Sequence, residues 1–156
     1  MINKFFKNIS LLLLCMFLGI TIVGCTKEVS NNTDLVLEIV NFDQEIAVPE
    51  MLKAVQSSNP NDLIQFYESN DELFKKKFSN YLTDEALNEY LLNSQPNLLL
   101  ELSKYSLPLQ IGDPIVENGD SQLITINFED SNNVEGSLMF QVQNADNKIS
   151  YIKFIA

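Results

Sequence analysis

Thiols, imidazoles and carboxylates are the side chains most often used in catalysis and metal binding, and this chain has an uneven set of them. It contains two cysteines, Cys15 and Cys25, no histidine, and 21 aspartates and glutamates. The absence of histidine excludes metal sites built on imidazole and catalytic sets that pair a serine or cysteine with histidine. Carboxylate chemistry and chemistry at the two thiols therefore remain open.

Oxygen-bearing side chains gather in the segment 129–135, which reads Glu-Asp-Ser-Asn-Asn-Val-Glu. Ca²⁺ prefers such ligands. The spacing of an EF-hand loop is absent, because Val134 occupies a position that needs an oxygen ligand and no glutamate follows at the distance required for bidentate binding. We therefore expect Asp130, Asn132 and Asn133 to form a solvated hairpin loop, and we expect no metal and no cofactor.

A carboxylate beside a tyrosine would suit an isomerase pocket, in which a desolvated acid acts as base and a phenol as donor. Asp113 or Glu117 with Tyr90 or Tyr105 would supply these groups if both pointed into one cavity. Acids and tyrosines at these spacings lie more often at the core edge and on the surface. A pocket enzyme of isomerase or dehydratase type is therefore the least favoured of three functional hypotheses.

Cys25 follows a segment with the layout of an export signal. Two lysines precede about fifteen mostly apolar residues, Ile9 to Val23, and Gly24 is a small residue next to the cysteine. The apolar run is shorter than the roughly twenty residues that a membrane-spanning helix needs. We therefore expect residues 1–24 to be a signal peptide that is removed. The alternatives are an uncleaved anchor helix and cleavage without lipid attachment.

The four residues Ile22-Val23-Gly24-Cys25 resemble the lipobox of bacterial lipoproteins. The resemblance implies that the sulfur of Cys25 receives a diacylglycerol, that cleavage follows Gly24, and that Cys25 becomes the first residue. Ile22 and Val23 differ from the commonest residues at their positions, although both are tolerated types. The expected location is thus the extracytoplasmic face of the cell membrane, with a lipid anchor. All basic residues of the chain are lysines, which suggests an AT-rich genome. A lipid anchor as the single attachment to the cytoplasmic membrane suits a Gram-positive envelope.

Removal of the signal peptide would make an acidic chain more acidic. The chain has 10 lysines, no arginine and a net charge of −11, and residues 1–24 hold two of the lysines and no acid, so 8 lysines and 21 acids would leave −13. Such a surface repels nucleic acids and anionic headgroups. Two acyl chains on Cys25 would hold the protein at the membrane, whereas a single chain would give only marginal membrane binding. A disulfide is excluded, because Cys15 would leave with the signal peptide.

The remaining chain is predicted to contain a tether and one domain. Turn-forming residues follow Cys25, so residues 25–41 are predicted as the lipidated cysteine and a flexible tether. The apolar run from Leu35 to Val40 alternates poorly, which leaves an added strand and a first helix as alternatives. Residues 42–156 have the size of a single domain.

The apolar pattern of this domain changes from helical spacing to strict alternation. Helical segments are predicted to start near Pro49, Pro60, Asn70, Asp84 and Ser94. Strands are predicted over 121–129, 136–144 and 148–155, with a shorter one within 110–116. Helices followed by antiparallel strands predict an α+β domain with helices on one face of a curved sheet of three to four strands.

This order of elements, ending in Asn147-Lys148-Ile149-Ser150-Tyr151-Ile152-Lys153-Phe154, resembles the NTF2-like (cystatin-type cone) domains of small bacterial lipoproteins. The last strand lacks the tryptophan often found there in that group. The resemblance implies a sheet wrapped around the helices, forming a cone that can hold a pocket. No catalytic residue is carried over, since no position matches one.

An apolar cone would make the protein a small-ligand receptor, which is the second functional hypothesis. The residues predicted to line it are Phe66, Phe74, Phe78, Tyr90 and Phe140.

The alternation of side chains along the strands predicts that the sheet face turned away from the helices is apolar. If Ile126 and Phe140 face the helices, the opposite face shows Leu123, Met139, Ile149, Tyr151 and Ile155. Exposed apolar area of a few hundred Å² commonly marks an interface. The alternative is that these residues are scattered singly or covered by the N-terminal segment. The leading hypothesis is thus a non-enzymatic accessory lipoprotein that docks an envelope protein, or a second copy of itself, through this face.

Overall fold

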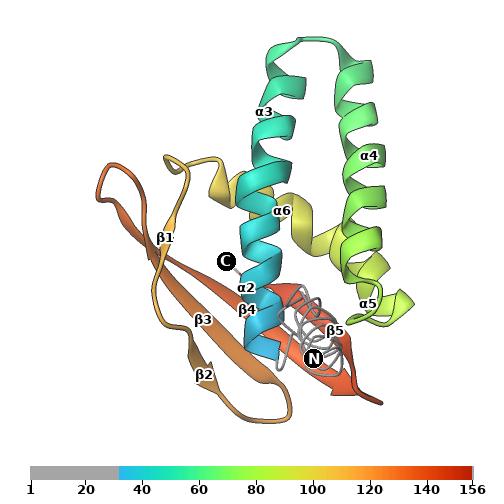
Figure 1. The fold of residues 1–156 in the computed structure, drawn as a ribbon, viewed down its shortest axis with the longest axis vertical. Helices are drawn as coiled ribbons and strands as arrows, with labels where there is room; N and C mark the ends of the chain where they lie inside the picture. Colours follow the sequence, from blue (N-terminus) through green and yellow to red (C-terminus); the bar gives the residue numbers. More distant parts are fainter. Residues whose placement is uncertain (1–31, 156) are drawn as a thin grey trace, which may run out of the picture.

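The computed structural model describes residues 32–155. Helical rods precede a curled antiparallel sheet (Figure 1). The helical elements are α2 (Asn32–Phe42), the π-helical turn η1 (Asp43–Ala47), α3 (Val48–Gln56), α4 (Pro60–Phe78), α5 (Asp84–Glu89), the π-helical turn η2 (Tyr90–Ser94) and α6 (Gln95–Leu102). The strands are β1 (Gln110–Ile111), β2 (Ile115–Glu117), β3 (Gln122–Glu129), β4 (Glu135–Ala145) and β5 (Lys148–Phe154). The predicted α+β class, with helices on one face of a curved sheet, is confirmed.

Two of the predicted helix starts carry a side-chain cap. The side chain of Asn59 accepts the backbone N–H of Asn61, and Pro60 fills the first position of α4. The side chain of Thr83 accepts the backbone N–H of Ala86 at the start of α5. The predicted break at Asn70 is absent, because α4 continues from Pro60 to Phe78.

The sheet has the order β1-β3-β4-β5, and β2 pairs with the same edge of β3 as β1 does. The turn between β4 and β5 uses Asp146 and Asn147, both at positive φ, as a two-residue hairpin turn requires. Pairing between these strands shifts after Gln143: Tyr151 lies opposite Gln143, and Ile149 opposite Asn144. Ser150 is therefore an extra residue, and this bulge reverses the face on which Ile149 lies.

The predicted domain boundary at residue 42 is wrong. α2 begins at Asn32, whose Nδ2 donates to Oε1 of Gln122 in β3 at 2.7 Å. The buried side chains of α2 are Leu35, Val36, Ile39, Val40 and Phe42. These positions recur at helical spacing, and their burial outweighs the turn-forming residues nearby. The signal peptide, Gly24, Cys25 and the first part of the predicted tether lie outside the described residues.

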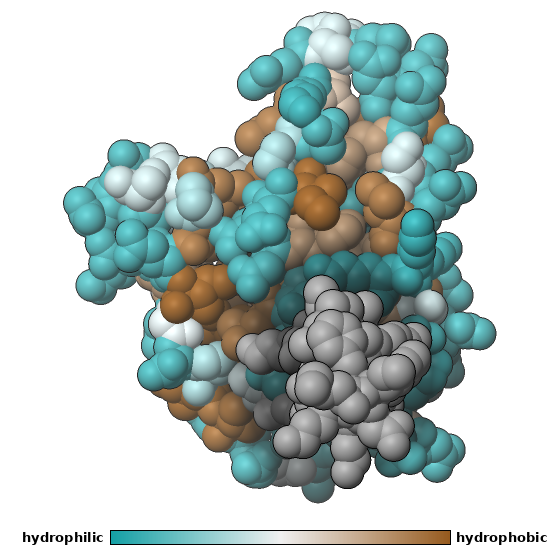
Figure 2. All heavy atoms as spheres, viewed as in Figure 1, coloured by the Kyte–Doolittle hydropathy of each residue, from teal (hydrophilic) through white to brown (hydrophobic). Residues whose placement is uncertain are grey.

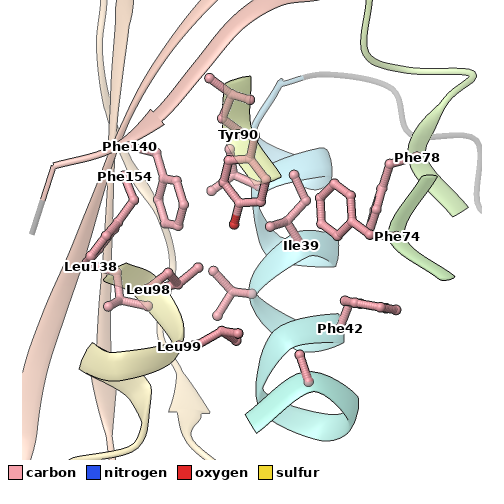
Figure 3. Packing of buried hydrophobic residues seen from close by; sticks show 14 of the residues in the cluster. Ile39, Phe42, Phe74, Phe78, Tyr90, Leu98, Leu99, Leu138, Phe140 and Phe154 are labelled. Atoms are coloured by element: carbon pink, nitrogen blue, oxygen red, sulfur yellow. The ribbon is translucent and has the colours of Figure 1, made fainter. Parts of the chain in front are cut away.

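Aromatic rings from α4, η2, β4 and β5 fill the space between the helices and the sheet (Figure 3). Phe74 of α4 stacks on Tyr90 with ring centroids 5.2 Å apart, and its centroid lies 4.4 Å from that of Phe78. Phe140 and Phe154 approach from β4 and β5 with centroids 5.6 Å apart. The interior of the curled sheet is thus a close-packed core.

α3 and α4 form an antiparallel pair that extends beyond the body of the domain (Figure 1). We call residues 48–78 the α3–α4 hairpin. Its lower end is fixed to α2, because Lys77 pairs with Glu38 at 3.0 Å and its ammonium lies 5.7 Å from the ring centroid of Phe42. The upper end of the hairpin therefore stands apart from the sheet.

Candidate functional site

A buried carboxylate lies where the two π-helical turns meet. Asp43 is the first residue of η1 and Tyr90 the first residue of η2, and both side chains are fully buried. The hydroxyl of Tyr90 donates to Oδ2 of Asp43 at 3.2 Å, and Nε2 of Gln95 donates to Oδ1 at 2.6 Å. π-helical turns recur at functional positions. Here they bring an acid and a phenol together inside the domain.

The hydrogen-bond chain continues from Gln95 to α4. Nδ2 of Asn70 donates to Oε1 of Gln95 at 2.8 Å. Asn70 is only 4% exposed, and its Oδ1 has no hydrogen-bond partner among residues 32–155. A buried polar atom without a partner costs about 1–3 kcal/mol. Oδ1 of Asn70 is therefore a buried acceptor that the described residues leave unpaired.

The environment of the cluster changes the proton affinity of both titratable groups. Burial raises the pKa of Asp43 from its ordinary value of 3.8 to about 7, against the opposing effect of the hydrogen bonds from Gln95 and Tyr90. Burial, followed by the neighbouring carboxylate of Asp43, raises the pKa of Tyr90 well above its ordinary value. Asp43 is therefore close to half ionised at neutral pH.

A groove of about 330 Å³ lies between α3 and α4, and Asn70 is part of its lining. We use "the groove" for this cavity. Its acidic lining residues are Glu50 and Asp62. Its apolar lining residues are Ile46, Ala47, Ala54, Phe66 and Leu73. The groove thus combines apolar walls, two carboxylates, the ammonium of Lys53 and the side chain of Asn70.

Apolar surface is exposed in the region between the two helices (Figure 2), and Ile46 and Leu73 are large exposed apolar side chains that line the groove. Six of the twelve large apolar side chains that are exposed in residues 32–155 belong to the α3–α4 hairpin or to the turn just before it. We call these six the hairpin patch: Ile46, Leu52, Val55, Ile64, Tyr67 and Leu73. The hairpin is therefore richer in exposed apolar surface than the sheet.

The five aromatic residues predicted to line a cone pocket pack against one another or against the helices. Phe74, Phe78, Tyr90 and Phe140 are buried in the core, and Phe66 alone contributes to the groove. The prediction fails for these four because their rings fill the space that an open cone would need.

The predicted apolar sheet face is not continuous. Ile149 is buried, because the bulge at Ser150 turns its side chain toward the helices. Leu123, Met139 and Tyr151 are half-buried, and only Ile155 is exposed, at 44%. Polar residues stand opposite the three half-buried ones in the ladder: Gln141 faces Leu123, Thr125 faces Met139 and Gln143 faces Tyr151. These residues are scattered singly, which was the alternative interpretation.

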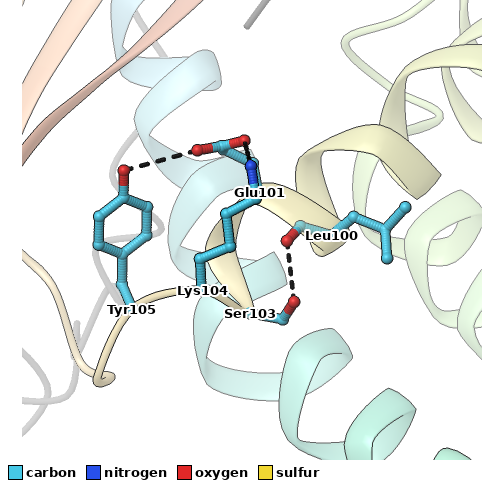
Figure 4. A network of polar contacts seen from close by, with 5 residues as sticks. All are labelled: Leu100, Glu101, Ser103, Lys104 and Tyr105. Atoms are coloured by element: carbon cyan, nitrogen blue, oxygen red, sulfur yellow. Dashed lines mark hydrogen bonds and ion pairs between the residues drawn. The ribbon is translucent and has the colours of Figure 1, made fainter.

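The structure does not bring the predicted acid and tyrosine pairs together. Asp113 and Glu117 are exposed, whereas Tyr90 is buried against Asp43. Tyr105 lies just past the end of α6, where its hydroxyl donates to Glu101 at 3.5 Å (Figure 4) and its ring meets that of Phe128 edge-on at 4.7 Å. The buried acid was missed because Asp43 was assigned to the start of the domain instead of to a helix.

Asp130 organises the turn between β3 and β4 in the predicted loop. Its Oδ1 accepts the backbone N–H groups of Asn132 and Val134, at 2.8 and 2.9 Å, and its Oδ2 accepts that of Ser106 at 3.0 Å. The N–H groups of Ser106 and Val134 hold the pKa of Asp130 below its ordinary value. The carboxylate of Asp130 is thus occupied by hydrogen bonds from three backbone N–H groups. Residues 32–155 contain no group of three or more acids placed to hold a metal ion.

No protein-family model, curated protein or solved structure matches the chain. Within residues 32–155, no helix has both the length and the apolar character needed to cross a membrane. The groove and the buried cluster beside it are therefore the features from which a function can be inferred.

Proposed function

We propose that the protein is a membrane-anchored extracytoplasmic lipoprotein that acts as a non-enzymatic accessory module and docks a protein partner through the α3–α4 hairpin. The observation that carries this proposal is the hairpin patch on a projecting helix pair. Ile46 and Leu73 of this set line the groove between the two helices, and apolar surface exposed beside a groove commonly marks an interaction site. The filled core supports a surface role, because Phe74 and Tyr90 occupy the interior where a receptor would hold its ligand.

The groove favours an amphipathic helix with basic residues as the docking segment. Two antiparallel helices with an apolar cleft between them suit the binding mode in which a helix lies in a groove. Two acids, Glu50 and Asp62, and one lysine, Lys53, line the cleft and leave it net negative. The chain without its predicted signal peptide carries a net charge of −13 from 8 lysines and 21 acids. Complementary charge speeds association and excludes acidic partners. The proposed partner is therefore basic along one side of its helix.

The membrane attachment in this proposal rests on the residues Ile22-Val23-Gly24-Cys25. Only residues 26–31 separate Cys25 from the first residue of α2. Six residues reach at most about 20 Å when fully extended. A diacylglycerol on Cys25 would thus keep α2 close to the membrane surface.

Replacement of Cys25 by serine is expected to abolish lipid attachment and cleavage after Gly24, because the hydroxyl is not a substitute for the thiolate nucleophile. Mass spectrometry of the purified wild type should give residues 25–156 plus a diacylglycerol, and the variant should give neither this mass nor a lipidated N-terminus. A wild type without lipid, or a variant with the wild-type mass, would contradict the assignment of Cys25.

Introducing charge into the hairpin patch is expected to abolish partner binding without unfolding the domain. We suggest Ile46→Glu combined with Leu73→Glu, since both side chains line the groove and are 42% and 49% exposed. The matched control is Leu92→Glu with Leu100→Glu, two exposed leucines outside the hairpin. Loss of apolar anchors at a docking site commonly lowers affinity by more than tenfold.

The measurement compares proteins retained from native membranes by the wild type and by the two double variants, with circular dichroism to check folding. A protein retained by the wild type and by the control, but reduced more than tenfold for the hairpin variant, is expected. Equal retention by both variants would overturn the proposal. A wild-type dimer in light scattering that only the hairpin variant loses would replace the partner by a second copy of the chain.

A further inference from the structure

We propose that a second cavity of the domain binds a neutral sugar. It lies at the end of the sheet where α2 begins, whereas the groove lies further along the chain, between α3 and α4. Its volume is about 620 Å³. We call it the amide pocket, because five of its lining side chains are amides: Asn32, Asn118, Gln122, Asn144 and Asn147. The inference goes beyond the docking of a partner on the hairpin.

Three separate segments of the chain bring these amides together. Asn32 is the first residue of α2. Asn118 and Gln122 border the connection between β2 and β3, and Asn144 and Asn147 border the turn between β4 and β5. Because β3 and β4 are antiparallel neighbours, the start of β3 lies beside the end of β4. Figure 1 shows the start of α2 at this end of the sheet. The amide pocket is therefore a product of the tertiary fold.

Hydrogen bonds orient three of the amides and leave both donors and acceptors for a ligand. Nδ2 of Asn32 donates to Oε1 of Gln122 at 2.7 Å, and Nε2 of Gln122 donates to Oδ1 of Asn118 at 3.0 Å. This direction leaves the NH₂ group of Asn118 as a donor and the carbonyl oxygen of Asn32 as an acceptor. The side chains of Asn144 and Asn147 are exposed and make no hydrogen bond to another residue of 32–155.

Sugar hydroxyls match a lining of this kind. A hydroxyl group has one donor and two acceptor positions, and a side-chain amide offers both an NH₂ group and a carbonyl oxygen. Thr33 adds a hydroxyl to the same lining. The ring of Tyr81 and the side chains of Leu35 and Val116 supply apolar walls against which the C–H face of a sugar ring can pack. Apolar walls with a few placed polar groups are typical of small-molecule sites.

The charge of the lining disfavours ionic ligands. No acid is among the described residues that line the amide pocket, so a cation would find no counter-charge there. Lys148 is the one charged residue in this lining, and its ammonium donates to the backbone carbonyls of Ser79 at 2.8 Å and Leu82 at 3.3 Å. An anion would also be repelled by the net charge of the chain, which is −11. The ligand is therefore neutral.

The position of the amide pocket indicates two sources of such a sugar. In the proposed lipoprotein, residues 26–31 join Cys25 to Asn32 and reach at most about 20 Å. The pocket would then lie near the membrane surface, where the headgroups of glycolipids are found, and a free glycan of the envelope offers the same hydroxyl groups. This placement rests on the proposed lipid anchor, whereas the chemistry of the pocket does not.

The test uses the full-length lipidated protein in micelles of a detergent without a sugar headgroup. Maltose, lactose and di-N-acetylchitobiose are the sugar probes, and inorganic phosphate and ethylammonium chloride are the ionic ones. NMR follows the side-chain amides of Asn118 and Asn147. At least one disaccharide is expected to bind roughly tenfold more tightly than either ion, because only a sugar can satisfy both donors and acceptors of the lining. Binding of none of the three sugars, or of an ion as tightly as the best sugar, would overturn the proposal.

A double variant removes the amides that no hydrogen bond ties to the fold. Asn144→Ala combined with Asn147→Gly should weaken sugar binding roughly tenfold and leave the NMR spectrum of the core unchanged, since glycine accepts the φ of 66° at position 147. The matched control is Asn61→Ala with Asn127→Ala, two exposed amides outside the lining. Equal sugar binding by the two double variants would overturn the assignment of the pocket.

Nanodiscs of phosphatidylcholine, with and without diglucosyl diacylglycerol, identify the source of the sugar. If the glycolipid headgroup fills the pocket, the disaccharide that binds in micelles should no longer shift the amide of Asn118 in the glycolipid nanodiscs. An unchanged titration would assign the pocket to a free glycan. The Ile46→Glu and Leu73→Glu double variant should bind the sugar as the wild type does, so a failure of partner docking and a failure of sugar binding are distinguishable.

Discussion

Replacement of Asp43 by asparagine is expected to make the protein more stable than the wild type at pH 8, and this advantage is expected to shrink as the pH is lowered to 5. The expected difference between the two pH values is on the order of 3 kcal/mol. No other single polar substitution in the described part of the chain is expected to change the pH dependence of folding as much.

The direction follows from the raised pKa of Asp43. Its pKa is about 7 in the folded protein and 3.8 as an ordinary aspartate, so the folded state binds more protons between these values. Stability from this group is complete below about pH 4 and is lost as the pH rises through 7. An asparagine has no charge to bury. Its NH₂ group can donate to Gln95, which then turns over and supplies a donor to Oδ1 of Asn70.

The measurement is urea unfolding of both proteins at pH 5, 6, 7 and 8. Asp113→Asn is the matched control, because Asp113 is exposed and its variant should follow the wild-type curve at every pH. Parallel curves for the wild type and Asp43→Asn would show that the carboxylate is not buried in the folded protein.

Replacement of Phe74 by alanine is expected to lower the free energy of unfolding by about 3–5 kcal/mol, a large share of the roughly 5–15 kcal/mol available to a domain. Phe74 is fully buried, stacks on Tyr90 and meets Phe42 and Phe78 at centroid distances of 5.6 and 4.4 Å. Truncation would remove these contacts and leave a cavity at the centre of the core.

The neighbouring residue provides the control. Leu73→Ala truncates a side chain that is 49% exposed and should cost less than about 1 kcal/mol in the same urea experiment. A Phe74→Ala variant as stable as Leu73→Ala would mean that the ring borders open space. The small-ligand receptor would then regain support against the docking module.

Local sequence signals were sufficient for the strands and for most helix starts. Alternation defines β3 and β4, and Asp146-Asn147 supplies the turn chemistry of the last hairpin. The extra residue Ser150 has no local signal, because a bulge depends on how the two strands pair. One such residue was enough to place Ile149 on the wrong face.

The buried cluster left a signal that helical spacing alone could have found. Asn70 lies midway between Phe66 and Phe74, each four residues away, so it interrupts the apolar stripe of α4. Asp43 interrupts the stripe between Ile39 and Ala47 in the same manner. A polar residue inside an apolar stripe indicates a buried hydrogen bond. Which polar residues meet is decided by the tertiary structure, through π-helical turns that no spacing rule predicts.

In the proposed lipoprotein, the continuity of α2, η1 and α3 would set how far from the membrane a partner is bound. These 25 residues form one rod, and at about 1.5 Å per residue it is about 37 Å long. Its first residue follows the proposed lipid attachment closely, and its last lies at the tip of the hairpin. The hairpin tip can therefore stand several nanometres above the bilayer, level with the soluble domain of a membrane protein and out of reach of its lipid-facing helices.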